Sequence, residues 1–511
     1  MQSMSRQAQV QTAPEQELVK GLGLTSATTL VMGSMIGSGI FIVSADIARL
    51  VDSPGLLILA WAVTGFMTVT GALAYGELAA MMPKAGGQYV YLRESLGPLW
   101  GFLYGWTLFL VIQTGTIAAV GVAFGKFLGV FFPSISSTNW IIHLWKAPPI
   151  HLGPMVLGNM HVGLNTQNLI AIITIVALTV VNVFGIKTGA AIQNIFTFAK
   201  TAALLGLVIA GALLFRNPAA VAANFTNFWQ VGTRHAELNI ASPFLLVITL
   251  LAVAQVGSLF SADAWNNVTF TAGEVKNPKR NLPLSLALGT GIVIGLYILA
   301  NFAYLNVLPL GGDPHGASVI ARGIQYATED RVATAAMVAM FGAAGGALMA
   351  AAILVSTFGC NNGLILAGAR VYYAMAKDGL FFRHAAHIHP QYRTPVYALI
   401  VQAIWTCILC LSGTYGQLLD YIIFAVLVFY ILTILGLFVL RQTRPHAERP
   451  YRAFGYPVLP AIYIVMAVFI DVVLLRYKPQ YTWPGLIIVL VGIPVYFLAR
   501  RAGLAPRASA D

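Results

Sequence analysis

Two stretches of small and polar residues interrupt apolar segments that are long enough to cross a bilayer, which takes roughly 20 helical residues. Residues 33–39 read Gly-Ser-Met-Ile-Gly-Ser-Gly, and residues 257–267 read Gly-Ser-Leu-Phe-Ser-Ala-Asp-Ala-Trp-Asn-Asn. A broken membrane helix leaves N–H and C=O groups that protein, a polar cavity or a ligand must satisfy. Half-helix N-termini present N–H groups to an anion, and half-helix C-termini present carbonyls to a cation. Together the two breaks suit a zwitterion, and an α-amino acid fits this description.

Two ionisable residues lie deep inside predicted apolar segments. Asp263 lies in the second break, where an ionisable side chain costs about 2.5–3.5 kcal/mol and normally faces a cavity or a partner. It could instead cap a half-helix, because aspartate is a favoured N-cap residue. Lys200 lies about ten residues from either end of its segment, so its ammonium cannot easily reach the interface. It could pair with carbonyls freed at the first break as a fixed counter-charge, or carry a proton, and the sequence leaves both roles open.

The glycine spacing of the first break has a simpler interpretation as well. Gly33 and Gly37 form a GxxxG pattern, which is typical of two membrane helices that pack closely. The second break, five segments later, favours a different reading. It predicts two inverted repeats whose first helices are discontinuous, which is a pattern that marks the binding site of a transporter.

The composition is that of a polytopic membrane protein. Of the 511 residues, 58% are hydrophobic and only 9% are charged, and the mean hydropathy is +0.79, whereas soluble domains carry about 25% charged residues. We therefore predict an all-α integral membrane protein with about 12 transmembrane helices. Segment 8 is too long for one bilayer, and we expect it to project into the cytosol. The predicted segments are 25–50, 56–82, 98–125, 166–185, 190–214, 243–271, 283–308, 332–376, 395–412, 416–440, 458–476 and 484–500.

The basic residues predict the orientation. With the N-terminus inside, the cytosolic side receives 19 of the 29 lysines and arginines, as the positive-inside rule requires. This placement explains the net charge of +12 without nucleic-acid binding. We expect a cytosolic N-terminal tail at 1–20, a single transmembrane domain at 21–501 and a cytosolic C-terminal tail at 502–511. The two repeats would occupy 25–214 and 243–440, followed by helices 11 and 12.

No residue pattern predicts a metal site, a cofactor or a catalytic centre. The cysteines lie in apolar segments as packing residues, and three histidines of the outer loop 126–165 lack the spacing of metal ligands. The predicted spans contain no histidine, which argues against a membrane-embedded enzyme. An ion channel stays a remote alternative, because neither charge rings nor a repeated carbonyl filter is visible. These cysteines and histidines are Cys360, Cys407, Cys410, His143, His151 and His161.

Over residues 21–452 the sequence resembles the amino acid–polyamine–organocation superfamily, and within it the L-type amino acid transporter branch. The resemblance rests on several motifs in a fixed order. They are Ile-Gly-Ser-Gly-Ile-Phe at 36–41, Glu-Leu at 77–78, Pro-Lys-Ala-Gly-Gly at 83–87, the stretches 182–200 and 260–266, Gly-Glu-Val-Lys-Asn-Pro-Lys-Arg-Asn-Leu-Pro at 273–283, Ser-Thr-Phe-Gly at 356–359, Asn-Gly at 362–363, and the pairs His-Pro at 389–390 and Thr-Pro at 394–395. The resemblance implies a LeuT-type 5+5 inverted repeat with broken helices 1 and 6, which works by alternating access.

The resemblance also implies the residues that contact the substrate. Backbone N–H groups of the first break and the Ser38 hydroxyl would bind the substrate carboxylate, and carbonyls of both breaks, with Met35 or Ile36 in the first, would receive its ammonium. Phe260 would close over the substrate from outside. The implied substrate-binding residues are Ile36, Gly37, Ser38, Gly39, Phe260, Ser261, Asp263, Val111 and Ile112.

Lys200 is implied to stand where sodium-coupled relatives bind a sodium ion. It would bridge toward Gly37 and toward Ser356 and Cys360 of segment 8. The resemblance therefore implies transport that does not depend on sodium.

Two positions depart from the family pattern. The aromatic residue that often follows Phe260 by two positions is Ala262 here, which leaves more room in the pocket. Asp263 occupies a place that is often glycine and that is acidic in relatives accepting cationic amino acids. A cationic amino acid or polyamine carrier is therefore the alternative to a permease for neutral amino acids.

The expected protein is a sodium-independent L-α-amino acid permease of the plasma (inner) membrane, with both termini cytosolic, which works by exchange or proton coupling. The outer loop 126–165 contains no cysteine to link a heavy chain, so we expect no such partner. The sequence is compatible with a monomer or a homo-oligomer.

Overall fold

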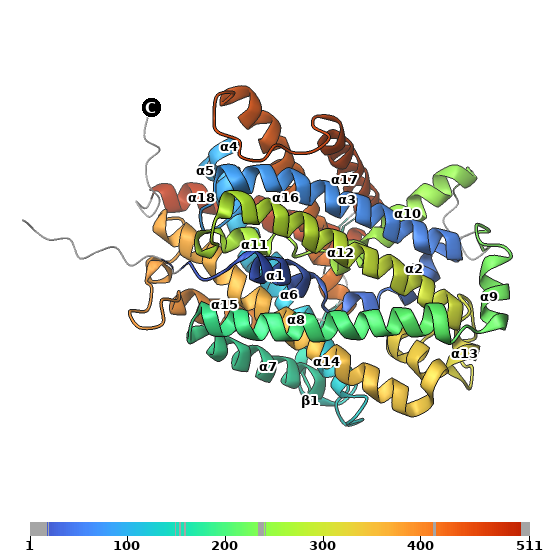
Figure 1. The fold of residues 1–511 in the computed structure, drawn as a ribbon. Coiled ribbons are helices and arrows are strands. Elements are labelled where there is room, and N and C mark those ends of the chain that lie inside the picture. The colour runs from blue at the N-terminus through green and yellow to red at the C-terminus, as the bar shows by residue number, and fades with distance from the viewer. Residues whose placement is uncertain are drawn as a thin grey trace, which may run out of the picture.

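The computed structural model of the chain describes residues 18–501, apart from residues 19, 149, 153–154, 158–159, 233–239, 241 and 412–414. It is mostly helical, and long helices run side by side through the molecule (Figure 1). Within the described residues, ten helices are long and apolar enough to cross a membrane. The chain is therefore a multi-pass membrane protein. The expected C-terminal tail and nearly all of the expected N-terminal tail lie outside the described residues.

Ten of the predicted segments coincide with these long helices. They are α3 (Pro54–Met81), the continuous run of α5 (Pro98–Thr107), η2 (Leu108–Ile112) and α6 (Gln113–Leu128), α7 (Thr166–Val183), α8 (Ile186–Ile209) continued by η3 (Ala210–Leu214), α10 (Pro243–Ser261), α12 (Pro278–Val307), α14 (Val332–Lys377), α16 (Tyr415–Thr443), α17 (Val458–Tyr477) and α18 (Pro479–Arg501).

The other two predicted segments contain shorter helices. Segment 25–50 is divided into α1 (Leu24–Met35), η1 (Gly39–Phe41) and α2 (Ser44–Val51), and segment 395–412 contains α15 (Val396–Cys410). The remaining short elements are α4 (Gln88–Leu96), α9 (Pro218–Phe225), α11 (Asn267–Phe270), η5 (Ala272–Glu274), α13 (Val319–Arg322), η6 (Thr328–Asp330) and η7 (Arg383–Ala386).

Local chemistry explains where the long helices begin. The Asn165 side chain accepts a hydrogen bond from the Asn168 N–H at the start of α7, and the Ser242 side chain accepts one from the Leu245 N–H at the start of α10. Such caps satisfy N–H groups that have no partner within the helix. α10 also begins with Pro243, whose missing N–H costs nothing at this position.

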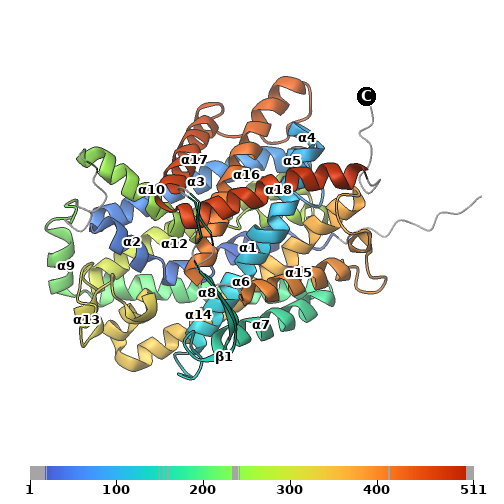
Figure 2. The ribbon, with the colours of Figure 1, turned by 180° about the vertical axis from the view of Figure 1, so that it is seen from behind.

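Both predicted breaks are confirmed. Residues 36–38 separate α1 from η1, and residues 262–266 separate α10 from α11. α1 packs against α8, α12 and α14, and α10 packs against α2, α3 and α16. Figures 1 and 2 show α1 in the middle of the bundle, surrounded by longer helices. In the most hydrophobic 18-residue stretch of the α5–α6 run, 83% of the residues are buried, whereas only 28% are buried in the corresponding stretch of α18. The α5–α6 run is therefore central and α18 is peripheral.

Part of the excess length of segment 8 comes from a break within it. α14 is interrupted at Gly342, whose φ of 66° is not helical. The part before Gly342 forms a separate piece, so only the remainder can project beyond the bilayer at its other end. A glycine within a long alanine-rich and glycine-rich run gives little warning of such a break.

The all-α prediction needs a correction in the loop between α6 and α7. This loop contains four short strands, β1 (Trp140–Ala147), β2 (Ile150–Leu152), β3 (Met155–Leu157) and β4 (Met160–Asn165). β1 pairs with β4 and β2 pairs with β3, both antiparallel. His143 and His161 lie in the larger hairpin, where His143 stacks on Trp140. In this part of the sequence, short apolar stretches are separated by proline and glycine, which is only a weak signal for strands. Long apolar runs, on which the predicted segments rest, do not reveal such strands.

Candidate functional site

The two breaks touch each other at the centre of the bundle. Gly39, at the start of η1, packs so closely on Ser261 that a Cβ at position 39 would lie 2.8 Å from the Ser261 Cα. The Tyr297 hydroxyl of α12 lies 2.9 Å from the Met35 carbonyl oxygen and 3.1 Å from the Ser261 carbonyl oxygen. A glycine is therefore required at position 39, and one tyrosine connects carbonyls of both breaks.

Lys200 of α8 is buried against the first break. Its Nζ lies 2.5 Å from the Gly33 carbonyl oxygen, 2.6 Å from the Ile36 carbonyl oxygen and 3.4 Å from the Ser356 carbonyl oxygen. An ammonium has three N–H donors, and these three carbonyls can accept all of them. The lysine therefore ties the end of α1 to α8 and α14.

α14 makes two further contacts with the first break. The Ser356 hydroxyl lies 3.0 Å from the carbonyl oxygens of both Ile36 and Gly37. The Cys360 Sγ donates to the Ser34 carbonyl oxygen at 3.1 Å. The structure thus brings together the lysine, serine, cysteine and glycine that the sequence placed in one group.

The carbonyls of the first break already accept hydrogen bonds from the protein. The Met35 oxygen accepts from the Gly37 N–H at 2.8 Å and from the Tyr297 hydroxyl. The Ile36 oxygen accepts from Lys200 and Ser356. Because a carbonyl oxygen has two lone pairs, a substrate ammonium at either position would have to displace one of these donors.

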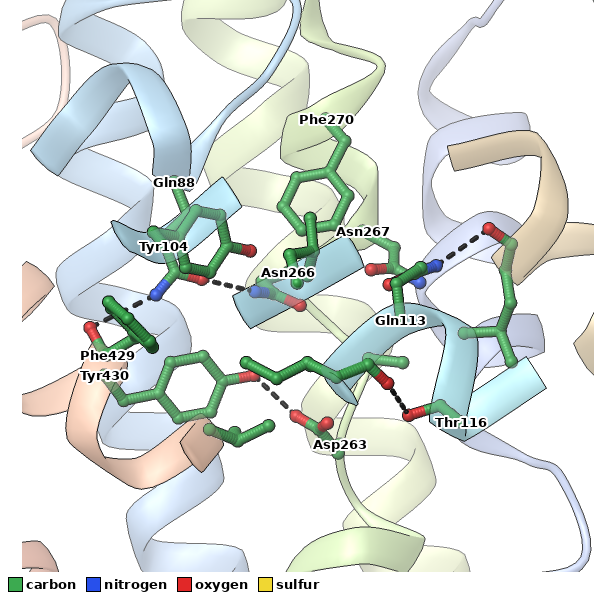
Figure 3. Close-up of a pocket in the computed structure, with 15 residues that line it drawn as sticks. Gln88, Tyr104, Gln113, Thr116, Asp263, Asn266, Asn267, Phe270, Phe429 and Tyr430 are labelled. Atoms are coloured by element: carbon green, nitrogen blue, oxygen red, sulfur yellow. Dashed lines mark hydrogen bonds between the residues drawn. The ribbon is translucent and has the colours of Figure 1, made fainter. Parts of the chain in front are cut away.

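A small cavity of about 20 Å³, room for roughly one water molecule, lies beside the second break (Figure 3). Its walls come from the α5–α6 run, from residues 263–270, from α14 and α16, and from the first residue of α4. Of the two residues predicted for a side-chain pocket, Ile112 lines this cavity and Val111 does not. Its polar lining residues are Gln88, Tyr104, Gln113, Thr116, Asp263, Asn266, Asn267 and Tyr430.

Asp263 faces this cavity. Its Oδ1 accepts a hydrogen bond from the Tyr430 hydroxyl at 2.5 Å, and the residue is 8% exposed. The alternative prediction, that Asp263 caps a half-helix, is wrong for α11, because the N-cap position of that helix is Asn266 and no side-chain cap bond is formed there. The carboxylate is therefore available to a ligand in the cavity.

Gln88 closes one end of the cavity. Its Nε2 donates to the Phe429 carbonyl oxygen at 3.1 Å and to the Thr433 hydroxyl at 3.0 Å, and its Oε1 accepts from Asn266 at 2.9 Å (Figure 3). All of these polar side chains are buried. Gln88 and Tyr430 thus form two separate bridges between the second break and α16.

The predicted gate residue Phe260 and the residues of the first break are also buried, but they lie outside the lining of this cavity. Phe260 ends α10 next to Ser261 and is 7% exposed. Ser38 is 1% exposed, and Gly39 is buried against Ser261. The two breaks therefore lie in direct contact, with the open space on the side of Asp263.

Two ion pairs, one fully and one partly buried, join elements beyond the cavity. Glu274 in η5 pairs with Arg370 of α14 at 3.1 Å, and both side chains are almost completely buried. The carbonyl oxygen of Glu274 also accepts from the N–H groups of residues 21 and 22, at 2.9 and 3.0 Å. Glu77 of α3 pairs with Arg441 at 2.6 Å. These contacts hold the start of α1, the end of the second break, α3 and α16 together.

A comparison with protein families identifies the chain. The family described as "Amino acid permease" matches residues 22–497. The chain belongs to the amino acid permease family. The predicted membership of this superfamily is thereby confirmed, and the permease is an amino acid transporter.

Individual relatives support the L-type branch. The permease is 30% identical to the serine/threonine exchanger SteT of Bacillus subtilis, over 94% of its own length and 97% of that protein. It is 28% identical to the human b(0,+)-type amino acid transporter 1, over 94% of its own length and 88% of the relative. It is 30% identical to the human large neutral amino acids transporter small subunit 2, over 94% and 80%.

Sequence reasoning missed several residues that shape the site of this permease. Tyr297 and Tyr304 lie seven residues apart on α12, and the Tyr304 hydroxyl donates to the Ile40 carbonyl oxygen at 3.2 Å. This spacing places both hydroxyls on one helix face, which is a signal that a search for polar tips in apolar segments would find. Gln88 and Tyr430 gave no such signal, because their partners are far away in the sequence.

Proposed function

We propose that this permease moves L-α-amino acids across the plasma membrane without sodium, by exchange or proton coupling, and that it alternates access around the two breaks. Its relatives include a protein named as an exchanger and others named as amino acid transporters. The first break has N–H groups for the carboxylate of an α-amino acid, and its carbonyls receive the ammonium once the substrate displaces one of their present donors. The residues that would bind the substrate are Ile36, Gly37, Ser38 and Gly39 at the first break and Phe260, Ser261 and Asp263 at the second.

The observation that carries sodium independence is the set of carbonyl oxygens around Lys200. Carbonyls at an unwound helix end are the ligands that coupling cations use in transporters with broken helices. Here the ammonium of Lys200 takes two such oxygens, those of Gly33 and Ile36, and lies 3.4 Å from the Ser356 carbonyl oxygen inside α14, with the Ser356 hydroxyl beside them. We propose that this fixed ammonium performs the structural role of a bound sodium ion.

We propose a LeuT-type arrangement for the whole chain. The ten long helices, the broken segment 25–50 and the short helix α15 add up to the twelve predicted spans. The breaks then fall at the first helix of each repeat, 25–214 and 243–440, within one transmembrane domain at 21–501. Both tails, 1–20 and 502–511, would lie in the cytosol, as the distribution of basic residues predicts.

We propose that the permease works without a heavy chain and without a catalytic reaction. One relative is named as a small subunit. In the present chain the loop 126–165 has no cysteine with which to form an intermolecular disulfide. A protein purified alone that transports amino acids would support this proposal.

A second candidate, a carrier for cationic amino acids or polyamines, is favoured by Asp263. The described residues that line the cavity include this one carboxylate and no lysine, arginine or histidine. A buried carboxylate without a cationic partner is costly. A substrate with a positively charged side chain would supply that partner.

The proposal is tested by uptake of radiolabelled amino acids into proteoliposomes that contain the purified permease. One set is loaded with unlabelled amino acid, and a second set has an inward proton gradient. Stimulation by internal amino acid supports exchange, and stimulation by the gradient supports proton coupling. Absence of uptake for every neutral and cationic amino acid in both sets would contradict the proposal.

A further inference from the structure

The described residues that line the cavity beside the second break carry negative charge only. Asp263 is its single carboxylate among the described lining residues, and the other polar groups there are neutral amides and hydroxyls. The residue is 8% exposed, so water does little to stabilise the ionised form. The groups around the carboxylate must therefore determine which side chains the cavity accepts.

Tyr430 is the side chain that donates to this carboxylate. Its hydroxyl, on α16, lies 2.5 Å from Oδ1, and Figure 3 shows the tyrosine ring pointing toward the carboxylate. A hydrogen bond to a charged group is stronger than one between neutral groups. Tyr430 thus supplies part of the stabilisation that a cationic substrate would otherwise provide.

Packing holds the Tyr430 ring in place. The ring lies 5.2 Å from the Trp265 ring and 5.7 Å from the Tyr75 ring, measured between centroids, and the second contact is edge-to-face. Trp265 belongs to the second break itself. The Tyr430 hydroxyl is therefore a fixed donor to one oxygen of Asp263, and the Asp263 side chain also lines the cavity.

We propose that Tyr430 is a specificity-determining residue that lets one cavity accept both neutral and cationic amino acids. With a neutral side chain bound, the Tyr430 hydroxyl stabilises the ionised Asp263. With a cationic side chain bound, the distal ammonium or guanidinium pairs with the carboxylate, and the tyrosine becomes less important. This inference rests on the proposed function, because it assumes that the cavity receives the side chain of a transported amino acid.

The inference makes a directional prediction for Tyr430→Phe. Removing the hydroxyl leaves the carboxylate more dependent on a cation from the substrate. Uptake of leucine should therefore fall relative to uptake of lysine, and we expect the lysine-to-leucine ratio of kcat/KM to rise by about tenfold, the value of one hydrogen bond to a charged group. The assay is run at pH 8, so that protons compete less for the carboxylate.

A double-mutant cycle with Asp263→Asn separates this role from a structural one. Asp263→Asn should lower lysine uptake far more than leucine uptake. In that background Tyr430→Phe should no longer change the ratio, because there is no charge to stabilise. Tyr372→Phe is the matched control, since Tyr372 is equally buried in α14, and its hydroxyl has no partner among the described residues.

Folding is followed in the same samples. The shift of the Tm by added lysine or leucine gives a binding readout that does not depend on transport. In Tyr430→Phe the shift caused by lysine should grow relative to the shift caused by leucine. Equal losses for both substrates in Tyr430→Phe, or a changed ratio that persists with Asp263→Asn, would overturn the inference while amino acid transport by the unmodified permease still stands. If the unmodified permease transports neither substrate, the proposed function fails first.

Discussion

Lys200 is the residue on which the architecture of the site depends most. A buried ammonium is costly unless hydrogen bonds compensate it. Here three carbonyl oxygens from α1, the first break and α14 do so. One side chain therefore satisfies carbonyl groups at the end of α1 and in the break, and it joins this end of the broken helix to two long helices.

Replacing Lys200 by methionine should lower stability strongly. The substitution keeps an unbranched apolar side chain one atom shorter than lysine but leaves the carbonyls of Gly33 and Ile36 without their shortest donor. Unsatisfied buried acceptors cost about 1–3 kcal/mol each, so we expect a loss on the order of 3 kcal/mol and a lower Tm in detergent. An unchanged Tm would show that water or other donors replace the ammonium.

Gly39 provides a steric test of the contact between the two breaks. A Cβ on this residue would meet the backbone of Ser261, so Gly39→Ala must separate the breaks or distort them. We expect transport to fall by at least tenfold, because small displacements of positioning groups have large effects on rate. Gly206→Ala in α8 is the matched control, since no heavy atom lies within 4 Å of the Cβ it would add. Equal activity of both variants would contradict the close contact.

At the residue scale, sequence predicted which residues gather and missed those that hold them in position. The resemblance implied that Lys200 lies near Gly37, Ser356 and Cys360. The structure places these residues around the first break, with the Lys200 ammonium on the carbonyl oxygens of Gly33 and Ile36 rather than on that of Gly37. Tyr297 could have been found from its seven-residue spacing to Tyr304 on one face of α12. Tyr430 and Gln88 were missed because each acts through a partner more than 30 residues away. Single-sequence patterns carry no information about such long-range pairs.

At the scale of elements, the two breaks and the ion pairs between helices hold the bundle together, and their burial decides how much each pair contributes. The pair of Glu274 and Arg370 joins the segment after the second break to α14, with a side-chain exposure of 0% and 1%. The pair of Lys279 and Glu448, by contrast, is exposed by 53% and 74%. A buried pair that loses one member leaves an uncompensated charge, whereas an exposed pair contributes about 0–1 kcal/mol.

Arg370→Ala should therefore loosen the packing of α14, the helix on which Cys360 lies ten residues before Arg370 and is 2% exposed. In a variant that keeps Cys360 and replaces Cys407 and Cys410 by serine, we expect a maleimide reagent to label Cys360 at least several-fold faster after Arg370→Ala. Lys279→Ala serves as the control and should leave the labelling rate nearly unchanged. Equal labelling in all three proteins would show that the buried pair does not keep this region closed.

Sequence predicted the elements best where hydrophobicity was continuous. Ten long helices and both breaks follow from long apolar runs and from small polar residues inside them. The strands β1 to β4 and the interruption at Gly342 were not predicted. Short strands in a mixed loop and a single glycine in a glycine-rich helix do not stand out from their surroundings.

At the scale of the whole molecule, the permease combines a tightly packed centre with helices that present apolar side chains outward. Exposed apolar residues are numerous on α7, α17 and α18, including Ile173, Val176, Val465 and Leu498. This distribution suits helices that face lipid. The site lies away from these surfaces, where helices from both ends of the sequence meet (Figure 2).

The dependence of uptake on sodium tests the account of the whole molecule most directly. Proteoliposomes loaded with amino acid are assayed in buffer that contains sodium, and again in buffer in which choline replaces sodium throughout. Because the ammonium of Lys200 already occupies the carbonyl oxygens beside the first break, we predict equal initial rates of amino acid uptake in the two buffers. Uptake that needs sodium, and that saturates as sodium is added, would contradict the central role assigned to Lys200.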